Sequence, residues 1–178
     1  MSTINDFRSK LTGGGARPSQ FRVTLEYPTS VIQTGLSEKG TFLIKTATLP
    51  ASTIQQIEVP FRGRMVKIAG ERMFQNWQVV ALNDNDFAVR KALEAWSSKI
   101  LNHGGTNGIL SPVDYIRPLY VEQLDRNDNA LRKYKFWNCY PVNVSDIQLD
   151  FGNVNAIEEY SVEFSVDYWT VDGDTQIV

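Results

Sequence analysis

The chain has 178 residues, of which 42% are hydrophobic and 21% are charged, and this balance is typical of a folded domain rather than of a disordered segment. Its 18 basic and 20 acidic residues give a net charge of −2. This balance argues against a dedicated nucleic-acid-binding protein, because such proteins usually carry a basic excess. A single cysteine excludes an internal disulfide framework and leaves no cysteine cluster for zinc.

We expect one domain over residues 1–178, because a chain of this length suits a single domain with a substantial core. The first residues, MSTINDFRSKL, contain no apolar signal segment, and no stretch of the chain is long enough to span a membrane as a helix. We therefore expect cytosolic synthesis and no membrane insertion.

Residues 1–20 are predicted to form a short helix and an arm. Ile4, Phe7 and Leu11 recur at the spacing of one helix face. The segment GGGARPS (13–19) then ends the helix. A flexible joint is expected there rather than a phosphate-binding loop, because Ala-Arg-Pro follows the glycines where a Lys-Ser/Thr pair would be required.

Most of the remaining elements are predicted strands. Runs of alternating or β-branched residues lie at 21–27, 41–48, 74–82, 115–124, 131–140, 145–151 and 158–169, and a hairpin of two further strands is predicted over 53–69. The polar segment 28–40 is expected to be a loop. Pro118 has no backbone N–H, so it predicts an edge strand or a bulged strand at that point.

One long helix is predicted at 86–100. Its apolar stripe consists of Ala88, Ala92, Leu93, Ala95, Trp96 and Ile100. Asn83 or Asp84 is the predicted N-cap, and Gly104 and Gly105 end the helix. Because helices do not alternate with the strands, we expect an α+β fold of mostly antiparallel strands: a curved sheet or barrel with this one main covering helix.

The last predicted strand, EEYSVEFSVDYW (158–169), has two chemically different faces, because successive strand residues point to opposite sides of a sheet. The apolar face consists of Tyr160, Val162, Phe164, Val166 and Tyr168. The polar face consists of Glu159, Ser161, Glu163, Ser165 and Asp167. From the pattern alone, this polar face meets bulk water, a substrate or an enclosed channel.

No catalytic, cofactor-binding or metal-binding residue is predicted. His103 is the only histidine and Cys139 the only cysteine, and they lie in different segments without partners for a triad or a metal site. Glu159 and Glu163 lie roughly 13 Å apart along one strand, which is too far for a glycosidase pair. We therefore expect a protein that is not an enzyme.

A resemblance to a known family is carried by two long segments, KTATLPASTIQQIEVPFRGRMVKIAGERMFQNWQVVALNDND (45–86) and VSDIQLDFGNVNAIEEYSVEFSVDYW (144–169). Both resemble the tail tube proteins of contractile-tailed bacteriophages. The pattern is LP-x-x-x-I-x-x-I-x-V-P-F followed by R-x-V-K-I-A-G-E-R-x-F-x-x-W, and the resemblance covers about residues 21–169. The loop 28–40 and the C-terminal tail 170–178 are longer than the family minimum.

The resemblance implies a structural polymer. It implies hexameric rings in which each subunit adds strands to one continuous barrel, and rings that stack head to tail into a hollow tube inside a contractile sheath. The implied partners are other copies of the chain, the tail sheath protein, the baseplate and tail terminator proteins, and DNA that passes through the lumen without specific binding. The implied place is the virion tail, assembled in the host cytoplasm. Tubes of type VI secretion have the same fold.

With the resemblance, the polar face of 158–169 is predicted to line the channel. DNA carries about one negative charge per 1.7 Å of its axis and would adhere to a basic wall, whereas an acidic and hydroxylated wall repels it. A second prediction concerns Arg62, Arg64 and Lys67, which cluster in the turn PFRGRMVK. Because head-to-tail contacts between unlike surfaces propagate, this turn is expected to meet acidic residues of the next ring.

Other functions stay open at the level of sequence. One is the tube of a bacterial contractile injection system, related to type VI, which moves protein instead of DNA. Another is a monomeric β-barrel that binds a small ligand, or a hydrolase that uses carboxylates. Capsid and portal genes beside this one would favour a phage, and rings or tubes in electron micrographs would exclude the monomeric alternatives.

Overall fold

The computed structural model describes residues 4–11, 13, 15–31, 35–109 and 111–172. In this part of the chain the helices are α1 (Ile4–Lys10), α2 (Leu36–Leu43), α3 (Ala88–Ile100) and α4 (Pro112–Tyr115). The strands are β1 (Phe21–Leu25), β2 (Ile44–Ala47), β3 (Ser52–Phe61), β4 (Arg64–Phe74), β5 (Trp77–Leu82), β6 (Arg117–Leu124), β7 (Ala130–Val144), β8 (Glu159–Ser165) and β9 (Tyr168–Val171). None of the described helices is long and apolar enough to cross a membrane.

The strands of the body form one antiparallel sheet in the order β1-β6-β7-β8-β5-β2, with β9 paired to β7 beside this path. The long strand β7 belongs to two layers, because its first part pairs with β6 and β9 and its last part pairs with β8. The sheet ends at β1 and β2, which do not pair with each other in the described residues, so it curves without closing. The predicted fold of mostly antiparallel strands is confirmed.

Aromatic side chains fill the space between the two layers. Trp77 of β5 stacks on Phe136 of β7 with ring centroids 4.4 Å apart, and Phe164 of β8 lies 5.9 Å from Trp77. All three are buried. The indole N–H of Trp77 donates to the carbonyl oxygen of Thr48 at 2.8 Å, so its burial leaves no polar group unpaired. The interior of the body is therefore a packed core and not a ligand cavity.

Helix α3 covers this core, as predicted. Trp96 is fully buried, its ring lies 6.2 Å from that of Phe164, and its indole N–H donates to the carbonyl oxygen of Tyr115. Val89 is also buried, whereas Ala95 of the predicted stripe is exposed. Positions 89, 92, 93 and 96 share one face of a helix with 3.6 residues per turn, and that face meets the sheet.

The predicted N-cap of α3 is wrong. Phe87 holds this position with a φ of 55° and makes no side-chain cap hydrogen bond. The two predicted caps are engaged elsewhere: the amide of Asn83 donates to Glu158, and the carboxylate of Asp84 pairs with Lys39. The backbone carbonyl of Asp84 accepts from the N–H of Phe87 and closes the turn instead.

Two segments differ in type from the prediction. Residues 36–43, predicted as the end of a loop and the start of a strand, form helix α2, which packs against β1 and buries Leu36 and Gly40. Residues 145–151 are not a strand, although their apolar residues alternate. The chain leaves the sheet after β7, and Asp150 accepts a hydrogen bond from the N–H of Gly152 in a turn.

Two further strand predictions need correction. Residues 75 and 76 separate β4 from β5, so the predicted strand 74–82 begins only at Trp77. The strand with Pro118 is central, between β1 and β7, and not an edge. Its pairing with β7 shifts register between Arg117 and Leu119, so the predicted bulge is confirmed and accommodates the missing N–H of proline.

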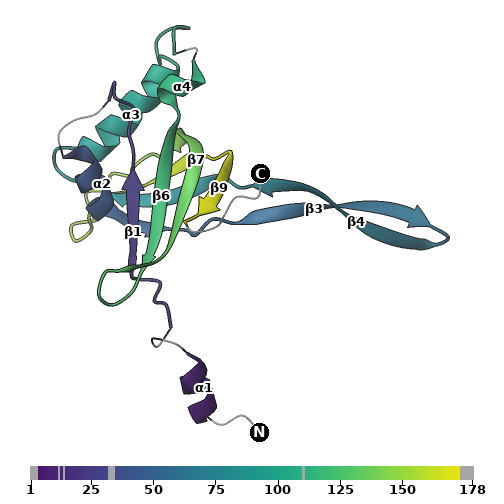
Figure 1. The fold of residues 1–178 in the computed structure, drawn as a ribbon. Helices are drawn as coiled ribbons and strands as arrows, with labels where there is room; N and C mark the ends of the chain where they lie inside the picture. Colours follow the sequence, from purple (N-terminus) through teal and green to yellow (C-terminus); the bar gives the residue numbers. More distant parts are fainter. Residues whose placement is uncertain (1–3, 12, 14, 32–34, 110, 173–178) are drawn as a thin grey trace.

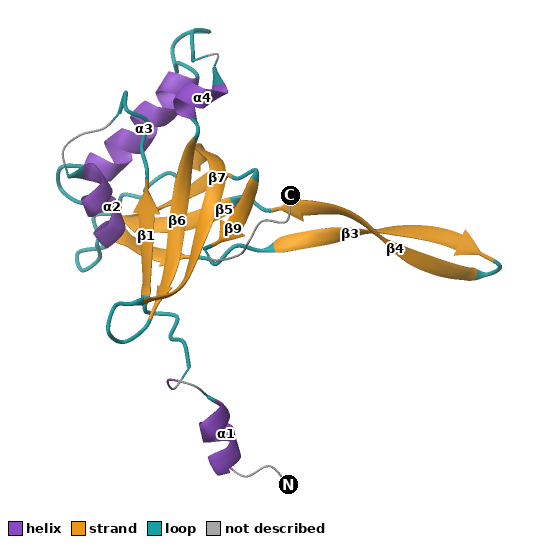
Figure 2. Cartoon of the chain, in the orientation of Figure 1, coloured by secondary structure: helices purple, strands orange, loops and turns teal. Residues whose placement is uncertain are grey.

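The hairpin β3–β4 and helix α1 extend away from the body. The hairpin is a separate two-stranded sheet that projects to one side, and α1 lies at the end of the N-terminal arm (Figure 1, Figure 2). The predicted helix at the N-terminus and the predicted hairpin over 53–69 are both confirmed, and the hairpin is longer than expected at each end. In the described residues, α1 buries no side chain, and the hairpin packs on the body only at its base, where the ring of Phe74 lies 6.1 Å from that of Trp169.

Candidate functional site

The alternation predicted for the last strand is present in β8. Tyr160, Val162 and Phe164 are buried, and Val166, which follows the strand, is buried as well. Tyr168 departs from the prediction: its side chain is 37% exposed, because the chain turns after β8 and Tyr168 begins β9, where it stacks on Trp137.

The polar residues of the row lie on the outward face of the sheet. Glu159 is exposed, and Ser161, Glu163 and Ser165 are partly exposed. Asp167 lies just beyond β8, where its carboxylate accepts a hydrogen bond from the side-chain amide of Asn138 at 2.7 Å. The structure therefore places four of the five residues on one strand and the fifth in the turn that follows it.

Neighbouring strands add polar groups to the same face. Glu163 lies opposite Gln78 of β5 and Asn143 of β7, and it accepts a hydrogen bond from the side-chain amide of Asn76 at 2.8 Å. Glu159 forms an ion pair with Lys45 of β2. This face of the sheet is therefore hydroxylated and only mildly acidic, because Lys45 offsets one of its two glutamates. The sequence pattern of 158–169 could not reveal Lys45, which is 114 residues away along the chain.

The hairpin β3–β4 has one largely apolar face and one mixed face, on which Glu58 and Lys67 lie beside Pro60 and Met65. Directly opposed residues of an antiparallel pair share a face, so the register places one set of apolar side chains together. This set, called the hairpin face below, consists of Ile57, Val59, Phe61, Val66 and Ile68. Each of these side chains is 42% to 61% exposed. A face of this kind on an isolated monomer indicates a surface that a partner covers.

The three basic residues predicted to act together are separated by this geometry. Arg64 lies opposite Phe61, on the hairpin face, and Arg62 occupies the turn with a φ of 46° and its guanidinium 5.3 Å from the ring of Phe61. Lys67 lies opposite Glu58 on the other face and forms an ion pair with it at 3.5 Å. Arg62 and Arg64 therefore form the basic tip of the hairpin, and Lys67 does not belong to it.

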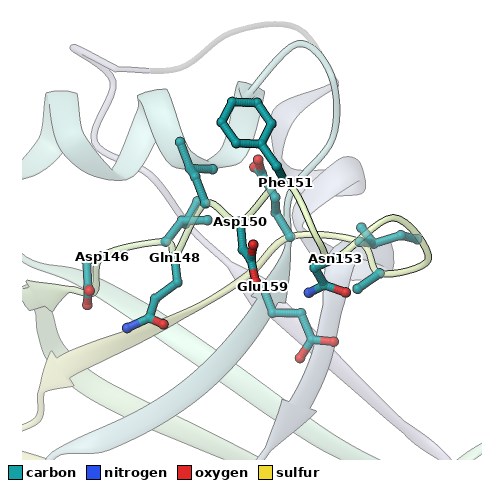
Figure 3. Close-up of a pocket in the computed structure, with 11 residues that line it drawn as sticks. Asp146, Gln148, Asp150, Phe151, Asn153 and Glu159 are labelled. Carbon is teal, nitrogen blue, oxygen red and sulfur yellow. The ribbon is translucent and has the colours of Figure 1, made fainter.

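The loop between β7 and β8 lines a cleft that the sequence pattern does not predict. Its volume is about 730 Å³, and its lining combines carboxylates with apolar side chains (Figure 3). The lining includes Asp146, Leu149, Asp150, Phe151 and Ile157. The alternation of Ile147, Leu149 and Phe151 is the signal in the sequence, but it predicts a strand and not an exposed loop.

The described residues contain no group of three or more histidine, cysteine, aspartate or glutamate side chains that could hold a metal ion. Cys139 is buried, which raises the pKa of its thiol to about 12 and keeps it protonated and unreactive. His103 lies in an exposed loop after α3. The features that distinguish the surface are therefore a polar sheet face, an apolar hairpin and an acidic cleft.

Comparisons with known proteins agree with this geometry. A family model described as phage tail tube protein matches residues 16–172. Tail tube protein gp19 of Enterobacteria phage T4 is 30% identical over 159 residues, which cover 89% of this chain and 93% of the relative.

Solved structures support the fold. A chain of the anti-feeding prophage baseplate, in a six-fold symmetrised structure, aligns with a TM-score of 0.62 at 10% identity and covers 96% of this chain and 97% of its own length. A chain of the sheath–tube complex of an extracellular contractile injection system, in its extended state, aligns with a TM-score of 0.57 at 10% identity. The alignment covers 96% of this chain and 98% of that one. Because the family model spans most of the chain and the T4 relative aligns over nearly its whole length, the chain belongs to the phage tail tube protein family.

Proposed function

We propose that this protein builds the inner tube of a contractile phage tail. Six copies form a ring, the rings stack head to tail, and the resulting tube conducts DNA from the virion into the host. The observation that carries this proposal is that the single chain leaves strand edges and apolar side chains uncovered. Its sheet ends at β1 and β2 without closing in the described residues, and its hairpin face is exposed from Ile57 to Ile68. Free strand edges and exposed apolar faces of this size require partners.

In the assembled tube, strands of neighbouring copies extend the sheet into one barrel. The partners of the tube are the tail sheath protein outside it and the baseplate and terminator proteins at its ends. The protein is a component of the virion tail, assembled in the host cytoplasm, and it acts without catalysis. A tube that moves protein cargo would need the same architecture, but the 30% identity to a tail tube protein of phage T4 favours a phage.

Electron microscopy of the purified full-length chain tests this proposal. Negatively stained particles should be rings or tubes with a central channel and six-fold symmetry in end views. A protein that stays monomeric at high concentration and low temperature would contradict the proposal and would favour a ligand-binding barrel.

The bore of the tube is lined by the outward face of β8, with Glu159, Ser161, Glu163 and Ser165 on the strand and Asp167 at its end. This face is polar, and its fixed charges are mildly acidic. The ammonium of Lys45 on this face is already paired with Glu159, so it is a weak site for a phosphate, and repulsion between like charges acts over a Debye length of about 8 Å at physiological salt. The DNA therefore moves without adhering.

The tip of the hairpin joins one ring to the next through Arg62 and Arg64. Lys67 supports the hairpin from its other face through Glu58 and contributes only to the local charge. Reversal of the tip, Arg62→Glu with Arg64→Glu, should leave rings intact and shorten or abolish tubes, because like charges would then meet at the stacking surface. Tube lengths measured in micrographs check this, with Lys67→Glu as the control that leaves stacking largely unchanged. Full-length tubes from the doubly reversed variant would contradict it.

A further inference from the structure

The cleft under the loop between β7 and β8 and the hairpin of the same chain have complementary surfaces. We propose that this cleft is the receiving site for the tip of the β3–β4 hairpin of a second copy, with Asp146 and Asp150 facing Arg62 and Arg64. This inference rests on the proposed tube and names the surface that the hairpin meets there.

The first support is charge. In the described part of the chain, Asp146 and Asp150 have no ion-pair partner, and neither have Arg62 and Arg64. The other two carboxylates of the cleft are already engaged, since Glu158 accepts from Asn83 and Glu159 pairs with Lys45. The cleft thus has two free negative charges and the hairpin tip two free positive charges.

The second support is apolar surface. The loop exposes Leu149, Phe151, Val154 and Ile157, each with 66% or more of its side chain accessible. The hairpin face, on a different part of the molecule, is less exposed, at 42% to 61%, but it is also uncovered in the single chain. A cleft of about 730 Å³ has room for the ring of Phe61 and an arginine side chain beside it. Mutual burial would remove both apolar surfaces from water.

The third support is direction. The hairpin enters β5 at Trp77, which lies opposite Phe164, whereas the loop enters β8 at Glu159, which lies opposite Leu82. The two elements therefore leave opposite ends of the same strand pair, separated by roughly 17 Å at about 3.3 Å per residue. The yellow-green loop and the hairpin also lie on opposite sides of the body in Figure 1. In this arrangement the hairpin of a chain cannot reach the cleft of the same chain, but it can enter the cleft of the next copy.

The hairpin is long enough for this contact. β3 extends over ten residues, so its tip lies roughly 30 Å beyond its base at about 3.3 Å per residue. Contacts between two unlike surfaces on opposite sides of a molecule repeat from copy to copy and generate rings or stacks. The contact proposed here therefore propagates the assembly.

A charge exchange between two variants tests the contact. The hairpin variant carries Arg62→Glu and Arg64→Glu. The cleft variant carries Asp146→Lys and Asp150→Asn, in which asparagine keeps the acceptor for the N–H of Gly152. Each variant alone should form at least about tenfold fewer tubes than the unmodified chain, because each substitution places like or unpaired charges against one another. An equimolar mixture should recover assembly, because every hairpin then finds a cleft of opposite charge on the other variant.

Recovery in the mixture also shows that both variants fold. A matched pair, Arg126→Glu and Asp114→Arg, changes exposed charges away from both surfaces and should assemble like the unmodified chain. Variants that assemble normally alone, or a mixture that stays as unassembled as its components, would overturn the proposed contact. In either case rings and tubes of the unmodified chain would leave the proposed function standing, whereas their absence would contradict the proposed function itself.

Engineered cysteines identify the occupant of the cleft. Cys139 is buried and protonated, so oxidation should act on introduced thiols. Phe61→Cys with Leu149→Cys in one chain should give cross-linked ladders on denaturing gels. The alternative occupant is the exposed apolar side of α1, tested by Phe7→Cys with Leu149→Cys. Ladders from the pair with Phe7 but not from the pair with Phe61 would overturn the assignment of the hairpin.

Discussion

Phe87 has a backbone conformation that its side chain does not favour. Its φ of 55° lies in the left-handed region, and it precedes α3 without a side-chain cap hydrogen bond. This conformation costs most residues roughly 1–2 kcal/mol, whereas asparagine adopts it more readily because its short polar side chain can hydrogen-bond locally. The backbone of Phe87 is held there by two hydrogen bonds: its N–H donates to the carbonyl oxygen of Asp84, and its carbonyl oxygen accepts from the N–H of Lys91.

Replacement of Phe87 should therefore separate the backbone strain from the side-chain contacts. Phe87→Asn should have a free energy of unfolding about 0.5–1 kcal/mol higher than that of Phe87→Ala, since both lose the ring but only asparagine suits the left-handed region. Urea unfolding of the two variants measures the difference. Equal stabilities, or a more stable alanine variant, would show that φ at this position carries no strain.

Helices α2 and α3 are tied together by one lysine. The ammonium of Lys39 on α2 lies against the carboxylates of Asp84 and Asp86, in the segment that leads into α3. The hydrogen bond that the Lys39 ammonium donates to Asp86 is the main cause that lowers the pKa of this carboxyl to about 2. The same contact raises the pKa of Lys39. Both groups are exposed, so the tie orients the helices more than it stabilises the fold.

This tie predicts an acid-sensitive contact between the two helices. The folded pKa of Asp86 is depressed, so the contact is fully present above the ordinary aspartate pKa near 3.8 and is lost as the pH falls through about 2. Carboxyl chemical shifts measured by NMR should give Asp86 a midpoint near the lower value. In Lys39→Met the midpoint should move back towards the ordinary value. An Asp86 midpoint that Lys39→Met leaves in place would exclude this cause.

At the scale of the whole molecule, the chain has a packed core and several surfaces that no other part of the single chain covers. Trp77, Phe136 and Phe164 are buried, and their rings pack together in the interior. The hairpin, the acidic cleft and the sheet edges all remain open in the single chain. This division is suited to a subunit that folds first and assembles afterwards, since assembly then uses surfaces that folding does not need.

The proposed bore gives a prediction at this scale. Glu163→Lys with Ser165→Lys should leave tubes largely intact and slow the release of DNA, because cations on this face would bind phosphates and neither residue lines the cleft proposed to receive the hairpin. Glu38→Lys on α2 is the control, as it changes charge away from the proposed bore. Release kinetics of particles built with each variant, measured at low salt, check the effect. Identical kinetics for the wall variant and the control would place this face outside the bore.

Much of the fold was predictable from the sequence, because its strongest patterns coincide with its burial. The alternation of Tyr160, Val162 and Phe164 and the helical stripe of Ala92, Leu93 and Trp96 each name the side chains that meet in the core. Helix α2 was not predictable in this way, since its polar sequence becomes helical where Leu36 and Gly40 pack against the body. The strand predicted for 145–151 is wrong for the opposite reason. Its apolar residues alternate, but no neighbouring strand pairs with this segment.

The candidate surfaces divide along the same line. Local periodicity and long stretches of matching residues are enough to predict the family, the antiparallel class, the two faces of β8 and the basic character of the hairpin turn. The folded chain is needed to see that Lys45 reaches Glu159, that Lys67 lies on the opposite face from Arg64, and that an acidic cleft forms at the far end of β8 from the hairpin. Strand register and chain reversal set these relations, and both are fixed by packing between segments that are distant in the sequence.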